Sequence, residues 1–429
     1  MAAGYTTERA GAVSARRRPG GSRQPKQMAS KTTQPAPKPI AGYYHTVDPN
    51  YGSSQEGSSN NHVFVPSQST ASNDGSQFPL DFLPSGTDGG GWEIADSRGS
   101  LLLLYRGVKL PNIFDAAKGA NPGLVVCEPM TRQYKEVPCS PEDDLKGHKC
   151  LGLFLLHGDK TRRFCGGGID ISLSNFKVMA ALLRPHCFSS GHGVPVACMF
   201  SRSSVSSVFS MEREVKGAWR SSVFSIGSDW HIVKRAWGVQ GIDVPSTIES
   251  FYLAGRACGS LYWGIEGTAG VALVLDEDTA GFSTAVLPEA TLGSHGRCSF
   301  RVIGGGDGVM HVVRVIDNDL LKVYTRIHGG DDKWVVERLV RLREATGELP
   351  GREDGYFQGE AVIVDAHDTY VLLTPREKTW LFSVVLETME VDRGHERNKY
   401  AGPGYPWELP LPVRKPWSPI SRLFSCIEI

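Results

Sequence analysis

The sequence of 429 residues lacks the features that would assign it to several common classes. It has no apolar run approaching the roughly 20 residues that cross a bilayer, so no membrane partner is expected. Its formal net charge is +0, which gives no general attraction to nucleic acid or anionic lipid. The first residues lack the apolar segment of a secretory signal. We therefore expect a protein of the cytoplasm, the nucleus or both.

Cysteine pairs of the Cys-x-x-Cys type are also absent. The nine cysteines are an odd number and stand at Cys127, Cys139, Cys150, Cys165, Cys187, Cys198, Cys258, Cys298 and Cys426. Without paired spacing they indicate neither a disulfide framework nor a structural zinc site. We expect reduced and mostly buried thiols that pack as small hydrophobic side chains.

The arrangements nearest to metal sites are two loose groups of histidine and cysteine. One is His186-Cys187 with His192, and the other is His148 with Cys150. Neither group has zinc-ligand spacing, so no metal or cofactor is expected.

Three further motifs were weighed as sites and favour structural roles. Residues Gly304–Gly308 lack the Lys-Ser/Thr and the following helix of a phosphate loop, which favours a hairpin loop. Residues Asp365–Asp368 (Asp-Ala-His-Asp) read as an ordinary turn between two strands. The aromatic and basic residues Trp230, His231, Lys234, Arg235 and Trp237 could contact nucleic acid, but packing of the tryptophans between sheets is favoured. With no nucleophile elbow and no clustered triad, no catalytic residue is predicted.

What is present in abundance is glycine, with 49 residues, together with 26 prolines, a composition typical of short strands and frequent turns. Residues 255–288 show the pattern most clearly. Three strands are predicted in succession at Leu261–Trp263, Val271–Leu275 and Phe282–Val286. The turn between the last two carries Asp276, Asp278, Thr279 and Gly281, with the glycine expected to accept a positive φ.

The same pattern occurs earlier in the chain. Gly99-Ser100 precedes a strand at Leu101–Tyr105, and a loop leads to Leu124–Pro138. In these two segments Thr131 corresponds to Thr279, and Tyr134 corresponds to Phe282. Such a repeat of antiparallel strands predicts an all-β fold, a β-propeller of about seven four-stranded blades, with six or eight also acceptable.

Composition divides the chain into three parts. Residues 1–77 are basic at first, including Arg16–Arg18, and then rich in Ser, Asn and Gly, with Val63–Val65 as one short candidate strand. A disordered tail is predicted, whose removal leaves thermal stability unchanged; the arginines could form a nuclear signal or part of a transit peptide. Residues 78–400 are the propeller. Residues 401–429 are a proline-rich segment expected to pack on it through Tyr405, Trp407 and Leu409.

Four segments in this order resemble the F-box-associated β-propeller proteins that are abundant in grasses. They lie at Leu124–Pro138, Gly259–Trp263, Leu273–Phe282 and Tyr400–Pro410. Members of that family carry an N-terminal F-box that binds a Skp-type adaptor of a ubiquitin ligase, while the propeller presents a substrate. Residues 1–77 here show neither apolar helical periodicity nor the Leu-Pro-x-x-x-Leu opening of an F-box.

The resemblance implies a non-enzymatic protein that binds other proteins through the propeller loops, without binding the adaptor itself. A full ligase role would need an F-box supplied elsewhere. A metal-dependent oxidase or hydrolase on a propeller scaffold is the alternative of a different class. Neither the bound protein nor the loops that bind it can be named from the sequence.

Overall fold

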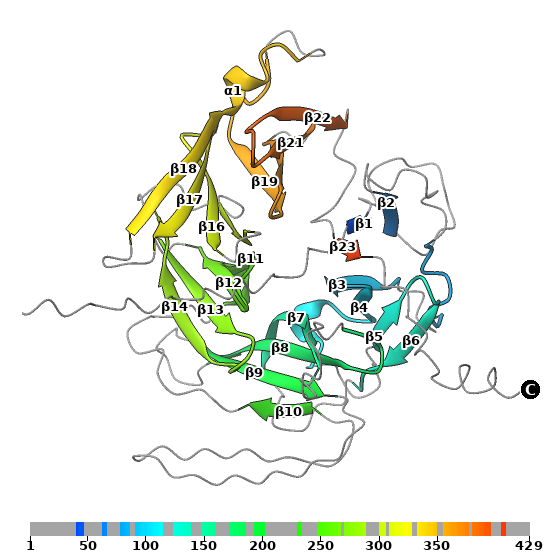
Figure 1. Ribbon diagram of the computed structural model, residues 1–429. Helices are drawn as coiled ribbons and strands as arrows, with labels where there is room; N and C mark the ends of the chain where they lie inside the picture. The colour runs from blue at the N-terminus through cyan, green and yellow to red at the C-terminus, as the bar shows by residue number, and fades with distance from the viewer. Residues whose placement is uncertain are drawn as a thin grey trace, which may run out of the picture. The chain divides into compact units, whose positions relative to one another are not determined.

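The structure is a computed structural model (Figure 1). It describes residues 40–46, 62–66, 78–85, 91–114, 123–138, 147–158, 171–185, 193–201, 230–233, 247–266, 270–288, 300–305, 309–327, 333–349, 355–376, 380–395 and 405–408. Within these residues the single α-helix is α1 (Leu342–Ala345), and two short 3₁₀ turns are η3 (Leu110–Asn112) and η5 (Ile248–Ser250). The all-β prediction is confirmed.

Most strands form antiparallel groups of four that follow the order of the chain. The first group is β3 (Glu93–Arg98), β4 (Leu101–Arg106), β5 (Gly123–Glu128) and β6 (Gln133–Glu136). The second is β7 (Lys149–His157), β8 (Phe176–Pro185), β9 (Gly193–Ser201) and β10 (Trp230–Val233). A further group near the end of the chain is β19 (Ala361–Ala366), β20 (Tyr370–Pro375), β21 (Leu381–Val385) and β22 (Val391–His395).

Two groups between these are joined into one sheet of eight strands. One is β11 (Phe251–Ala257), β12 (Ser260–Ile265), β13 (Val271–Asp276) and β14 (Phe282–Val286). The other is β15 (Phe300–Gly304), β16 (Met310–Ile316), β17 (Leu320–Ile327) and β18 (Lys333–Arg341). A short parallel pairing of β11 with β15 connects them.

The repeat seen in the sequence extends to the backbone of its turns. Arg132 follows Thr131 and Ala280 follows Thr279, and both Arg132 and Ala280 have a left-handed φ near 50°. An acidic residue three positions before each threonine fixes the turn, since Thr131 donates to Glu128 and Asp276 accepts from the Thr279 amide. The left-handed residue is thus Ala280, not Gly281 as the sequence suggested.

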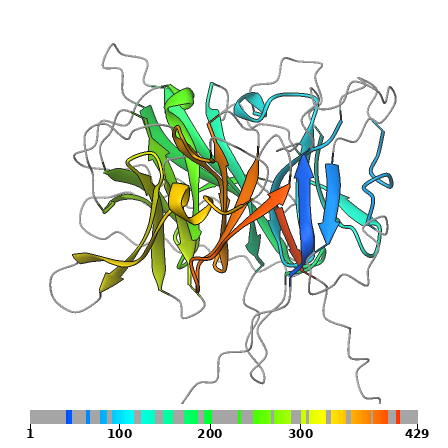
Figure 2. The ribbon, with the colours of Figure 1, turned by 90° about the horizontal axis from the view of Figure 1, so that it is seen from above.

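Residues from both ends of the chain share one sheet. β1 (Ile40–Thr46) pairs antiparallel with β2 (His62–Pro66) on one side and with β23 (Tyr405–Glu408) on the other. Figure 2 shows the blue β1 and β2 beside the red β23. The expectation of disorder up to residue 77 does not hold for β1 and β2.

The physical reason is visible in the packing of β1 and β2. Tyr44 is 1% exposed, its ring lies 5.0 Å from that of Phe64, and its hydroxyl donates to the carbonyl of Phe78 at 3.1 Å. A few aromatic side chains in a polar segment can therefore bury as much area as a typical core strand. Of the proline-rich segment the structure describes Tyr405–Glu408, which form the edge strand β23, where Pro406 needs no ladder donor. Packing of this segment through its side chains stays a prediction. The side chains of Tyr405 and Trp407, and Leu409, lie outside the description.

Contacts between the sheets run around the molecule and return to their start. The first strand of each four-stranded group contacts the first strand of the next group: β3 contacts β7, β7 contacts β11, β11 contacts β15 and β15 contacts β19. β23 touches β3, and Tyr43 of β1 stacks on Tyr370 of β20. Sheets that each pack on two neighbours in this way form a β-propeller. The number of blades stays a prediction.

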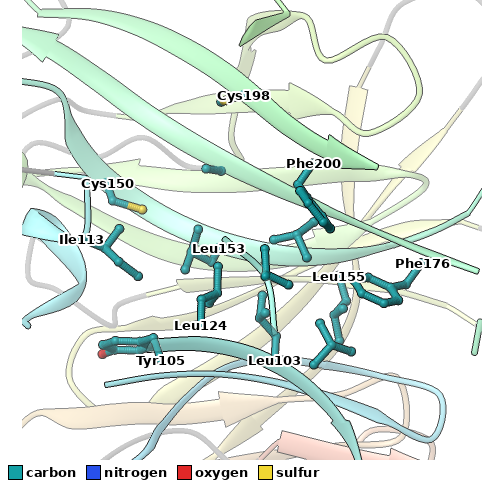
Figure 3. Close-up of a cluster of buried hydrophobic side chains, with 14 of the residues drawn as sticks. Leu103, Tyr105, Ile113, Leu124, Cys150, Leu153, Leu155, Phe176, Cys198 and Phe200 are labelled. Carbon is teal, nitrogen blue, oxygen red and sulfur yellow. The ribbon is translucent and has the colours of Figure 1, made fainter. Parts of the chain in front are cut away.

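Apolar side chains fill the space between neighbouring sheets. Figure 3 shows one such cluster, between the sheets of β3–β6 and β7–β10. Its members include Leu103, Tyr105, Leu124, Leu153, Leu155, Phe176, Cys198 and Phe200. All are buried. Of the cysteines that the structure describes, Cys127, Cys150 and Cys198 are buried, as expected, whereas Cys258 is exposed.

Candidate functional site

A pocket of about 550 Å³ lies between the sheet of β15–β18 and the sheet of β19–β22. Its walls include the connections β15–β16, β19–β20 and β21–β22 and the nearby ends of β16 and β17. This volume is within the range of pockets that take a small molecule or a protein side chain. The pocket is polar, and its lining includes the titratable side chains of His311, Glu337, Arg338, Asp368 and Glu387.

A β-bulge explains how Glu337 and Arg338 both line the pocket although they are consecutive residues of β18. Successive side chains of a regular strand point to opposite faces. Here Val336 pairs with Tyr324 and Arg338 with Val323, so that Glu337 is the extra residue of a bulge. Bulges redirect side chains in this way and occur often beside functional sites.

Polar contacts join three lining residues of the pocket around Glu337. Arg338 Nη2 lies 3.2 Å from Glu337 Oε1, and His311 Nε2 lies 3.4 Å from Glu337 Oε2. Arg338 Nη1 also donates to the carbonyl of Leu386, across the gap between the two sheets. Both basic groups of the pocket therefore have internal partners.

Two motifs weighed as sites in the sequence meet at this pocket. Gly305 belongs to the Gly304–Gly308 loop, and Asp368 belongs to the Asp365–Asp368 turn. Gly305 donates its amide to Val309 in an antiparallel hairpin, and the Asp365–Asp368 turn connects β19 and β20, so both structural readings are confirmed. The sequence did not show that the two loops lie together.

The Asp365–Asp368 turn also packs against the sheet of β1, β2 and β23. His367 Nε2 lies 3.1 Å from Asp365 Oδ2. The His367 ring lies 5.1 Å from Tyr43 and 4.8 Å from Tyr370, and the two tyrosine rings meet edge to face at 5.8 Å. We name Tyr43, Asp365, His367 and Tyr370 the closing cluster, since it joins strands from opposite parts of the chain.

Burial and charge act in opposite directions on the pKa of His367. Burial lowers this pKa, whereas the carboxylates of Asp365 and Asp368 raise it, and the net pKa lies above the ordinary value. Burial together with the same carboxylates raises the pKa of Tyr43 and of Tyr370, so both hydroxyls stay protonated at neutral pH.

The raised pKa of His367 gives a testable pH dependence. A group whose pKa is higher in the folded state adds stability that is present below its unfolded pKa, about 6.5 for histidine, and is lost as pH rises through the folded value. The free energy of unfolding of the wild type minus that of His367→Gln should therefore fall as pH is raised from 6 to 9, in urea titrations. His157→Gln, at an exposed histidine, is the control and should show no such trend. A difference that rises with pH would contradict the assignment.

A second polar network lies where three sheets meet, and it holds them together. Glu277, after β13, binds Arg98 Nη1 at 2.9 Å and Arg256 Nε at 2.6 Å. Both guanidinium groups donate to the carbonyl of Leu155 in β7, at 3.1 Å. Asp96 accepts from the Leu155 amide at 2.7 Å, and burial raises the pKa of this carboxyl. Each charge thus has a partner, which indicates a structural role.

The other residues that the sequence offered as candidate ligands or contacts do not form a site within the part of the chain that the structure describes. His148 and Cys150 are both buried, and Cys150 Sγ contacts the carbonyl of Gly152. Trp230 and His231 belong to β10, whose side chains lie outside the description together with Lys234, Arg235 and Trp237. His186, Cys187 and His192 lie outside it as well. Within the described ranges, no three His, Cys, Asp or Glu residues are placed to hold a metal ion, and no helix has the length and apolar character needed to cross a membrane.

Comparison with known proteins adds structural relatives only. No family model matches the chain, and no curated protein matches it. Solved structures similar to it include the β-propeller domain of Cps50 (Swd1) from Myceliophteria thermophila, at 8% identity and a TM-score of 0.33, covering 73% of this chain and 89% of that one. AztD from Citrobacter koseri is similar at 10% identity and a TM-score of 0.28, covering 75% of this chain and 74% of that one. A glycosyl hydrolase from Bacteroides ovatus is similar at 10% identity and a TM-score of 0.28, covering 73% of this chain and 86% of that one.

Proposed function

We propose that this chain is a non-enzymatic β-propeller that binds another protein through the loops around the pocket, in the manner of the F-box-associated proteins it resembles. The observation that carries the proposal is the pocket itself, formed by connections of two neighbouring sheets. Loops held by a rigid scaffold are where binding residues concentrate, because they can vary without disturbing the core. Here the scaffold also directs the side chains of Glu337 and Arg338, in the middle of β18, to the pocket through the bulge in that strand.

The proposal can be tested with a photoactivatable residue at either end of one strand. Thr369 precedes β20 at the pocket, and Arg376 follows β20 at the opposite end of the same sheet; both are exposed. Benzoylphenylalanine at position 369 should cross-link a partner protein from a cell extract, identified by mass spectrometry. The same residue at position 376 is the matched control and should give little of that product. Cross-linking mainly from position 376 would place binding at the other end.

The same experiment bears on the ligase role. We expect no Skp-type adaptor among the proteins cross-linked or retained by the purified chain, since the sequence of residues 1–77 shows no apolar helical periodicity of the kind that such an adaptor binds. Direct calorimetric titration with an adaptor should give no heat of binding. Tight binding would instead support a full ligase role.

A further inference from the structure

We infer that the pocket accepts a basic side chain, arginine or lysine, of the partner polypeptide. This inference deepens the proposed function and rests on it. The charge of the lining is the first step: it carries three carboxylates, Glu337, Asp368 and Glu387, against the basic groups of His311 and Arg338.

The basic groups of the lining are already used within the protein. Arg338 gives one Nη to the Leu386 carbonyl and the other to Glu337, and His311 approaches the second oxygen of Glu337. The guanidinium of Arg338 and the ring of His311 are therefore both directed at one carboxylate. An acidic ligand would have to displace these contacts before it could bind Arg338.

The other two carboxylates have no such partners. Asp368 and Glu387 are exposed, and neither forms a hydrogen bond or ion pair with any residue that the structure describes. Asp368 acts on His367 only through its charge, while the histidine itself bonds to Asp365. Both carboxylates are thus accessible to a ligand in the pocket, although the charge of Asp368 also acts on His367.

The register of the sheet brings these two residues to the same end of the sheet. Tyr370 of β20 pairs with Val385 of β21, and the Leu386 amide donates to the Thr369 carbonyl at 2.8 Å. One residue further along each chain are Asp368 and Glu387. Both line the same pocket, and a cation bound there would offset the repulsion between their like charges.

The size and the walls of the pocket also fit a long basic side chain. Val323, Val385 and Leu386 supply apolar surface on which an aliphatic stem can lie. Two carboxylates at the opening suit a guanidinium, which offers donors in a planar fork, and also suit an ammonium. The volume of about 550 Å³ leaves room for the neighbouring residues of a bound peptide.

The test uses the full chain and nonapeptide pools displayed on beads, each with one residue fixed at the centre and the other positions randomised. Five pools have Arg, Lys, Gln, Leu or Glu at the centre. We expect the wild type to retain the Arg and Lys pools about tenfold more strongly than the Glu pool, a ratio typical of one favourable charge contact. The variant Asp368→Asn/Glu387→Gln should lose most of that preference.

A control variant removes the same charge elsewhere. Glu348→Gln/Asp392→Asn changes two exposed carboxylates that do not line the pocket, and it should keep the preference. Equal loss in both variants would show a general charge effect and overturn the inference, as would a preference for the Glu or Leu pools or no preference at all. None of these outcomes decides the proposed function, which depends separately on cross-linking from position 369. Thermal melts of both variants should match the wild type, because neither change touches the core.

Discussion

A chain that begins at residue 67, and so lacks β1 and β2, is expected to lose cooperative thermal unfolding or to melt at least about 10 °C lower than the full chain. The shortened chain loses Tyr44 and Phe64 from the core, and removal of a buried aromatic side chain costs about 3 to 5 kcal/mol. Two such losses approach the entire stability of a typical protein, roughly 5 to 15 kcal/mol. Differential scanning calorimetry measures the effect directly.

The matched control begins at residue 37, just before β1, and keeps every strand that the structure describes. It should melt within about 2 °C of the full chain, a shift below roughly 1 kcal/mol for a protein of this size. Equal melting of all three proteins would mean that β1 and β2 contribute nothing to the fold. The expected loss is the reverse of what the composition of residues 1–77 alone indicates.

Replacing Glu277 by alanine should destabilise the protein by about 2 to 3 kcal/mol in chemical denaturation. Removing one partner of a buried ion pair commonly costs 3 to 5 kcal/mol, because the other charge remains without compensation. The lower figure applies here because the side chains of Arg98 and Arg256 are 23% and 26% exposed, so water screens them in part. Both arginines would keep the carbonyl of Leu155, and Arg256 would keep Asp96.

The neighbouring residue provides a control for this substitution. Asp278 is exposed and lies in the same turn, so Asp278→Ala should change the free energy of unfolding by no more than about 0.5 kcal/mol. If Glu277→Ala changed the free energy of unfolding equally little, the network between the three sheets would not contribute to stability.

Sequence patterns predicted the strands well wherever apolar runs and turn residues alternate. The strands predicted at Leu261–Trp263, Val271–Leu275 and Phe282–Val286 are found within β12, β13 and β14. The local signal sufficed there because each strand pairs with its neighbour in the chain. Reduced, buried thiols were predicted for the same reason, namely that burial follows from residue type at strand positions.

Pairing between distant residues could not be predicted in this way. The sequence of β1 offers two tyrosines in a segment that is otherwise poor in large apolar residues. The contribution of β1 to stability depends on its contacts with Phe78 and with the distant strand β23. The pocket was missed for a related reason, since it needs the bulge at Glu337 and the packing of two sheets. The run Lys333–Arg341 gives no sign of a bulge, because the extra residue is defined only by its partner strand β17.

The pairing of β1 with β23 has a consequence for synthesis on the ribosome. β1 and β2 emerge early, but the other edge of β1 has no strand to pair with until residues Tyr405–Glu408 have been made. Pairing between such distant segments is slow, and an unpaired edge invites association with other chains in the meantime. We therefore expect the nascent protein to carry an open edge through most of its translation, until β23 pairs with β1.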